Sequence, residues 1–352
     1  MTRFRLFAGI SLLSLLLPSE FPPISPASFA AEKRPAPAAG PTGARKRVSI
    51  EKIDYKGWPN SYRISNGKLE LVATTDVGPR IIRLAVPDGP NEFKEFDEMI
   101  GKTGGSEWRI YGGHRFWHAP EVRPRTYAPD NERVDAKIEG DTLRLTQPVE
   151  TSTGIQKEVE IRLSPDAPRA RVTHRLTNRG SWPVELAPWA LSVMAPGGAA
   201  FLPHPAKPAD ADRLLPNRTL ALWPYSDMAD PRHVWGKEFF VVKSRDAQGP
   251  TKIGVSASDG WAAYSHNGRL FVKRFHYMPG ERYPDLGSAV EIYTATGMLE
   301  LETLGPLRTL QPGGTVEHVE EWFLIDGPEV TDEASARKAA EVIRRETEAV
   351  RL

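Results

Sequence analysis

Hydrophobic and polar residues alternate in short runs from about residue 49 to residue 326. Successive side chains of a strand point to opposite faces of a sheet, so this alternation predicts one strand after another. Turn signals separate the runs, and the pairs Asn66-Gly67 and Asn267-Gly268 fit the type I′ turn of a hairpin. Their recurrence every 8 to 15 residues or so is typical of an all-β sandwich or barrel.

The end of the chain has a different pattern. Thr331 or Asp332 can cap a helix that runs from about residue 333 to residue 350. Its weakly apolar face consists of Ala336, Ala339, Ala340 and Ile343. We therefore expect a short helix, within residues 328–352, that packs on the surface of the sheet.

No linker-like stretch interrupts residues 49–327. This length favours two large antiparallel sheets in one domain over two separate domains. The Pro-rich stretch 203–231 is predicted to be a long loop inside that domain rather than a boundary.

The N-terminus has the features of a secretion signal. A basic start is followed by an uncharged apolar run at residues 6–17, which is too short to span a membrane. Small residues at Ser28 and Ala30 predict cleavage after Ala30. Residues 31–48, rich in Pro and Ala, are expected to form a flexible tether. These features predict a periplasmic or secreted bacterial protein with no integral membrane segment after cleavage.

Composition and charge exclude several classes of function. The chain has 32 Pro and 29 Gly residues, which favours many turns over a helical bundle. Its 46 basic and 45 acidic residues give no basic surplus for nucleic acid. Residues 1–30 carry two arginines and one glutamate, so the remaining chain is formally neutral, which suits a neutral sugar better than a polyanion. The absence of Cys excludes disulfides, thiolate metal sites and Cys nucleophiles.

Residues 107–121 carry the densest chemistry of the chain. Gly112, Gly113 and Pro120 make a long helix improbable, so a loop is predicted. As a sugar site, Trp108 or Trp117 would stack on the ring. Four neighbours would bond the sugar hydroxyls: Arg109, His114, His118 and Glu121. The alternative is an inter-strand loop whose aromatic residues plug the sandwich.

The spacing His114-x3-His118-x2-Glu121 also resembles a metal-binding pattern. Histidines four residues apart meet on one face of a helix, but this segment is not expected to be helical. We therefore predict neither a metal nor another cofactor.

Strand alternation indicates further candidates. Lys273 shares a face with aromatic neighbours and is either a site residue or a snorkelling surface lysine. Lys157 shares a face with aliphatic neighbours near the start of its strand, which is expected to put it at the mouth of a site. His174 lies between apolar residues, where a hydrogen-bonded core histidine is the commoner case. Glu300 and Glu302 point to one face, and two close carboxyl groups raise each other's pKa, as a general acid or base requires. The alternative is the solvent-facing side of an amphipathic strand.

Several segments resemble known families. Residues 69–84, LELVATTDVGPRIIRL, resemble the opening strands of galactose mutarotase-like proteins, residues 301–303 resemble the strand that carries their catalytic Glu, and residues 310–323 resemble their closing strand pair. Over residues 55–325 the chain also resembles a bacterial family of unknown function, family 4380. The matching stretches are 55–61 (YKGWPNS), 112–121 (GGHRFWHAPE), 126–131 (TYAPDN) and 185–191 (ELAPWAL).

The resemblance implies a galactose mutarotase-like β-supersandwich whose concave face binds carbohydrate, with Arg80 among the binding residues. It implies Glu302 as the general base, with His114 or His118 as the acid. Mutarotases carry a second His where this chain has Trp189, which cannot transfer a proton. Two hypotheses therefore stay open: an epimerase-, mutarotase- or lyase-like enzyme, and a non-catalytic saccharide-binding protein. An enzyme should place Glu302 and a His in one pocket.

Overall fold

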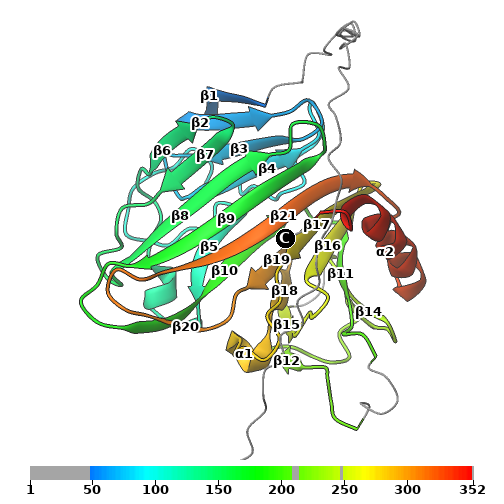
Figure 1. The fold of residues 1–352 in the computed structure, drawn as a ribbon. Coiled ribbons are helices and arrows are strands. Elements are labelled where there is room, and N and C mark those ends of the chain that lie inside the picture. Colours follow the sequence, from blue (N-terminus) through cyan, green and yellow to red (C-terminus); the bar gives the residue numbers. More distant parts are fainter. Residues whose placement is uncertain (1–47, 208–213, 246–248, 351–352) are drawn as a thin grey trace, which may run out of the picture. The chain divides into compact units, whose positions relative to one another are not determined.

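The computed structural model describes residues 48–207, 214–245 and 249–350 (Figure 1). The predicted signal peptide and all but the last residue of the predicted tether lie outside these residues. Within the described part of the chain, the strands form two sheets, and neighbouring strands in both pair antiparallel. The predicted all-β class, with antiparallel sheets and a C-terminal helix, is confirmed.

The first sheet has eleven strands within the described residues. Its central strand β10 pairs with β5 on one side and with β19 on the other. In order across the sheet, the strands are β1 (Ser49–Tyr55), β2 (Trp58–Ser65), β3 (Glu70–Thr74), β4 (Arg80–Ala85), β5 (Gly113–Ala119), β10 (Val184–Met194), β19 (Met298–Leu304), β18 (Val290–Ala295), β15 (Thr251–Val255) and β12 (Leu220–Leu222), and β20 (Arg308–Leu310) also pairs with β10.

The second sheet has ten strands within the described residues. Its long strand β21 lies between β17 and β9. In order, the strands are β13 (His233–Trp235), β14 (Phe239–Lys243), β11 (Ala199–Pro203), β16 (Trp261–His266), β17 (Arg269–Phe275), β21 (Thr315–Asp326), β9 (Arg169–Asn178), β8 (Ile155–Leu163), β7 (Thr142–Thr146) and β6 (Asp135–Glu139).

The main core lies between the two sheets. Leu71 and Ile81 of the first sheet and Phe271 and Trp322 of the second belong to one buried cluster. Burial of each such side chain contributes about 1.5–3 kcal/mol. Two short helical turns, η1 (Arg125–Tyr127) and α1 (Pro284–Gly287), lie in connections between strands. No helix among the described residues has the length and apolar character needed to cross a membrane.

Helix α2 (Glu333–Thr347) starts where the sequence predicts and ends three residues earlier. Its face of small residues, including Ala336 and Ile343, packs with Phe201 and Phe323 of the second sheet. The helix therefore covers the face of that sheet that is turned away from the main core (Figure 1).

A capping box fixes the start of α2. The Asp332 carboxylate accepts from the Ser335 amide at 2.8 Å, and the Ser335 hydroxyl accepts from the Asp332 amide at 3.1 Å. We expect Asp332→Ala to lower the free energy of unfolding by about 1 kcal/mol, because it leaves helix N–H groups unpaired. Urea denaturation measures the change. Glu341→Ala, on an exposed position of the same helix, is the control, and an equal loss in both variants would contradict the cap.

The predicted loop at residues 107–121 is wrong in part, because strand β5 occupies most of its second half and is buried throughout. Gly113 has φ +67°, and a Cβ there would lie 2.4 Å from the Ile81 carbonyl oxygen, so glycine lets β5 start close against β4. Both faces of β5 are covered. Buried polar and aromatic side chains lie on both faces, so no hydrophobic–polar alternation marks the strand in the sequence.

Candidate functional site

The central strands of the first sheet carry polar residues on both faces. On β5, His114 and His118 point to the second sheet, where His114 contacts His174 of β9. Arg115 and Trp117 point to the opposite, outer face of the first sheet. Glu300 of β19 lies on that outer face too, since it pairs with Arg115. The first sheet thus separates a cleft on its outer face from a buried cluster between the sheets.

The cleft has a volume of about 530 Å³. Its floor crosses strands β5, β10, β19, β18 and β15, and connecting segments before and after β5 and after β12 form its walls. The aromatic side chains that line it include Trp108, Trp117, Tyr127, Trp189, Trp223 and Tyr225. A concave site of this size with aromatic walls and few polar groups is typical of a small-ligand site.

Trp117 is the centre of the aromatic wall. Its ring centroid lies 5.3 Å from that of Trp108, 5.1 Å from Tyr127 and 5.4 Å from Trp189, all in tilted or edge-on arrangements. Such contacts stabilise each ring by more than its burial alone. The wall is therefore held in place by its own packing.

An ion pair crosses the cleft floor. Arg115 donates to Glu300 at 2.6 Å, and its guanidinium lies 4.5 Å from the centre of the Trp117 ring. At the rim, the guanidinium of Arg123 lies 4.3 Å from the centre of the Tyr127 ring, and the Tyr127 hydroxyl donates to Glu121. The charges of the floor are thus paired with each other, and planar guanidinium groups extend the aromatic surface.

Lys252 lies at the other end of the floor with two carboxyl groups beneath it. Its ammonium is 2.6 Å from Glu291 and 3.0 Å from Glu302, and it lies 4.6 Å and 4.7 Å from the ring centres of Trp189 and Trp223. The indole N–H of Trp189 donates to Glu302 at 2.8 Å. Glu302 is fully buried and lies below the surface of the cleft rather than on it.

Burial controls the protonation of Lys252, Glu291 and Glu302. It raises the pKa of Glu291 well above its usual range and also raises the pKa of Glu302. Burial by itself would lower the pKa of Lys252, but the two carboxyl groups outweigh it and the pKa is raised, so Lys252 stays an ammonium. With one cation between two buried carboxyl groups, the arrangement favours a proton on Glu291.

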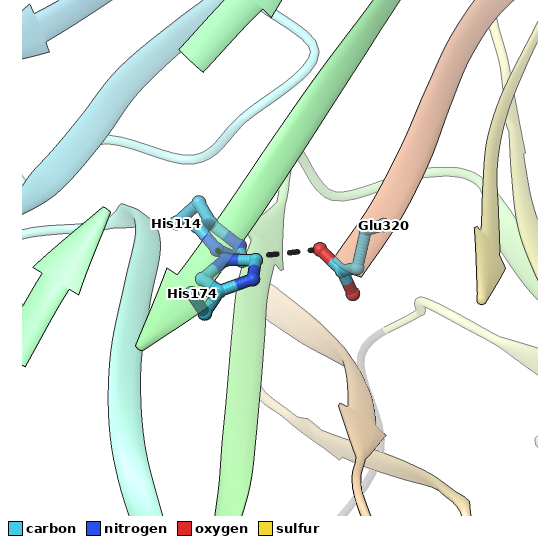
Figure 2. A group of neighbouring side chains, drawn as sticks. All are labelled: His114, His174 and Glu320. Carbon is cyan, nitrogen blue, oxygen red and sulfur yellow. Dashed lines mark hydrogen bonds and ion pairs between the residues drawn. The ribbon is translucent and has the colours of Figure 1, made fainter. Parts of the chain in front are cut away.

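The buried cluster between the sheets contains a chain of hydrogen bonds through His114 and His174, which Figure 2 draws together with Glu320. His174 Nδ1 donates to the His318 carbonyl at 3.0 Å, so the neutral ring accepts at Nε2. His114 Nε2 therefore donates to His174 Nε2 at 2.8 Å, and His114 Nδ1 accepts from Ser192 at 2.9 Å. Burial lowers the pKa of His174 to about 4 and that of His114 well below its usual value, which keeps both rings neutral.

These residues include one group with metal-ligand spacing. His114, His174 and Glu320 each offer an atom within 4.8 Å of the others (Figure 2). The donor set does not fit a cation as it stands, because the Nε2 lone pair of His174 already accepts a hydrogen bond. The ammonium of Lys273 also lies 2.9 Å from Glu320 and supplies the positive charge. The predicted pattern His114-x3-His118-x2-Glu121 is not brought together, since Glu121 lies at the rim of the cleft.

Lys273, predicted at the sugar site, is fully buried behind the cleft. Its ammonium donates to the carbonyl oxygens of Ala190 on β10 at 3.1 Å and Leu301 on β19 at 3.3 Å. Burial would raise the pKa of Glu320, but Lys273 in particular lowers it to about 2. The lysine thus joins the two strands that form the cleft floor from their other side.

Lys157 and His118 lie in a second buried group between the sheets. Lys157 is 2.5 Å from Glu150, and the His118 ring is 3.9 Å from the same carboxylate. Burial lowers the pKa of His118. Burial by itself would raise the pKa of Glu150, but Lys157 together with His118 and Thr153 lowers it to about 2. Both side chains are buried, so this geometry supports neither the predicted place of Lys157 at the mouth of a site nor the predicted role of His118 as an acid or sugar ligand.

Arg80 and Arg109 hold the segment before β5. Arg80 is fully buried, donates to Asp130 at 2.7 Å and to the carbonyl of Gly112 at 2.8 Å. Arg109 donates to the Gly104 carbonyl at 2.7 Å and to the Tyr111 hydroxyl at 3.1 Å. Neither lines the cleft, so they position the segment that carries Trp108 rather than face a ligand.

The structure therefore brings together about half of the predicted site residues. The members in or directly below the cleft are Trp108, Trp117, Glu121, Glu300 and Glu302; those elsewhere are Arg80, Arg109, His114, His118, Lys157 and Lys273. Sequence reasoning missed Lys252, although a lysine inside the buried run TKIGV of β15 was a signal for it. It also missed Trp223, because its segment was expected to be an unstructured loop.

Solved structures share this fold at low sequence identity. A TPR-domain containing protein from Parabacteroides distasonis is 15% identical with a TM-score of 0.52; the match covers 76% of this chain and 47% of that one, so this chain spans about half of that protein. A protein from Synechocystis sp. is 12% identical with a TM-score of 0.51, over 78% of this chain and 99% of that one. A galactose mutarotase-like protein from Lactobacillus casei is 12% identical with a TM-score of 0.49, over 76% and 100%.

At these identities the likeness concerns the fold alone. No protein-family model matches the sequence, and no curated protein matches it. Membership of the family of unknown function therefore stays a prediction.

Proposed function

We propose that this protein binds a carbohydrate in the aromatic cleft on the outer face of the first sheet. The observation that carries the proposal is the wall of Trp108, Trp117, Trp189 and Trp223 around two internally paired ion groups. Indole faces stack on the apolar C–H surface of a sugar ring, while the paired charges at the floor can bond its hydroxyls. The signal at residues 1–30 supports a periplasmic or secreted location as part of this proposal.

Non-catalytic binding is the form of the proposal that the geometry supports best. The enzyme hypothesis needs Glu302 and a histidine in one pocket, but Glu302 lies under the cleft, whereas His114 and His118 lie on the other face of the same sheet. The group next to Glu302 is instead Lys252, whose raised pKa makes its ammonium a poor proton donor.

Trp223→Ala tests the proposal. We expect it to weaken binding of a responding saccharide by about tenfold to a hundredfold, because the loss of an aromatic side chain that stacks on a ligand at a hot spot costs about 2 kcal/mol. Isothermal titration calorimetry against mono- and oligosaccharides measures the change, and Tyr225→Ala, at a more exposed position, is a second variant.

Trp182→Ala is the matched control, since Trp182 is 81% exposed in the turn between β9 and β10 and does not line the cleft. Equal affinity in the Trp182 and Trp223 variants, or no binding of any saccharide by the unaltered protein, would contradict the proposal.

A further inference from the structure

The length of the cleft indicates how large its ligand is. Lining residues come from every strand in the hydrogen-bonded series β5, β10, β19, β18 and β15: Arg115 is on β5 and Lys252 is on β15. Four steps at about 4.8 Å give a floor of about 19 Å. A single pyranose ring is much shorter than this floor, so a monosaccharide would leave most of it uncovered.

Aromatic side chains stand at both ends of this floor. Trp108 packs on Trp117 at the β5 end, and Trp223 packs over Lys252 at the β15 end. A monosaccharide needs one stacking platform, whereas separated platforms suit a chain of rings. Exposed residues follow at each end of the cleft floor: Arg123 beyond β5 and Tyr225 beyond β12. An oligosaccharide can therefore extend from the cleft into solvent in both directions.

The charges of the cleft floor limit which class of oligosaccharide it can bind. Arg115 is paired with Glu300, and Lys252 is paired with Glu291 and Glu302. Only Arg123 at the rim has no ion-pair partner among the described residues. A polyanionic chain needs a row of available cations, which this floor does not offer.

We infer that the cleft holds a neutral oligosaccharide of three or more residues, lying across strands β5 to β15, rather than a single sugar. The inference rests on the proposed carbohydrate binding and names its ligand class. Trp108 and Trp223 are the stacking platforms of its two end subsites.

The test is a calorimetric titration with ladders of one to five residues, using gluco-, galacto-, manno- and xylo-oligosaccharides, with galacturonate oligomers as the acidic probe. We expect affinity for a responding neutral ladder to rise at least tenfold from one residue to three and then level off. Trp108→Ala and Trp223→Ala should each weaken binding of the trisaccharide more than binding of the monosaccharide. Trp182→Ala should leave the whole ladder unchanged.

The test distinguishes failure of the oligosaccharide inference from failure of the proposed carbohydrate binding. Equal affinity for the monosaccharide and the trisaccharide overturns the inference and leaves carbohydrate binding intact. Tighter binding of the galacturonate ladder overturns the neutral class. A protein that is folded by its thermal melting curve and binds no saccharide overturns both the inference and the proposed function.

Discussion

Between pH 6 and pH 4.5 the protein should lose unfolding free energy as the pH falls, on the order of 1–3 kcal/mol per pH unit. The cause is a set of five buried histidines whose pKa is lowered and which stay neutral in the folded state: His114, His118, His174, His233 and His318. Because burial lowers their pKa below the unfolded value, to about 4 for His174 and about 3 for His318, the unfolded chain takes up protons first. Stability is thus fully present above about pH 6.5 and is lost as pH falls.

Two carboxyl groups act in the opposite direction. The raised pKa of Glu291 keeps a proton on it in the folded state where the unfolded chain has released it, and the raised pKa of Glu302 acts in the same direction, so both groups favour folding as pH falls. The histidines with a lowered pKa outnumber these two carboxyl groups, so unfolding takes up protons on balance, and each net proton contributes about 1.4 kcal/mol per pH unit. Below about pH 4.5, Glu150 and Glu320, whose pKa is about 2, add to the loss.

Urea denaturation at pH 7, 6, 5 and 4.5 measures this slope. His118→Leu should reduce the slope by up to about 1.4 kcal/mol per pH unit, the contribution of one proton, because it removes one histidine with a lowered pKa. Neither ring nitrogen of His118 has a hydrogen-bond partner that the change would leave unpaired. His276→Leu, at an exposed position, is the control. The same unfolding free energy at pH 7 and pH 5 in the unaltered protein would refute the account.

Lys273→Met should cost on the order of 3–5 kcal/mol of unfolding free energy at pH 7. It removes the ammonium that lies 2.9 Å from Glu320 and leaves that carboxylate buried without its cation. It also leaves the carbonyl oxygens of Ala190 and Leu301 without their donor. Such a loss is a large part of the stability of an ordinary domain.

The double variant Lys273→Met with Glu320→Gln separates the cost of an unpaired buried carboxylate from the cost of lost side-chain packing. Removal of the unpaired carboxylate should restore a large part of the loss, which a double-mutant cycle measures as a coupling free energy. Lys338→Met, on the exposed side of α2, is the control. A loss of unfolding free energy below about 1 kcal/mol for Lys273→Met would show that the Lys273–Glu320 ion pair is not needed for stability.

The fold could be predicted from the sequence to a large extent because hairpins leave local marks. Asn66-Gly67 and Asn267-Gly268 lie at the turns of the β2–β3 and β16–β17 hairpins, and Asp332 caps α2. Strand β5 was missed because both of its faces are buried, which removes the alternation that marks a half-exposed strand.

The site was harder to predict, since the sequence shows that two residues share a face only within one strand. Alternation correctly grouped Glu300 with Glu302, and it also separates Trp117 from His118. It cannot tell which face of a strand meets the second sheet. His118 and Lys273 therefore seemed as suitable for the site as Trp117, although the packing of the sheets buries them behind it.

The packing of the aromatic wall has an optical consequence. Four of the nine tryptophans line the cleft, and the rings of Trp108, Trp117 and Trp189 form a series with centroids 5.3 Å and 5.4 Å apart at interplanar angles of 59° and 73°. Indole transition dipoles that are this close and tilted couple into a chiral exciton band. The circular dichroism of the folded protein should therefore carry a tryptophan couplet that reports directly on the cleft and that Trp117→Phe abolishes.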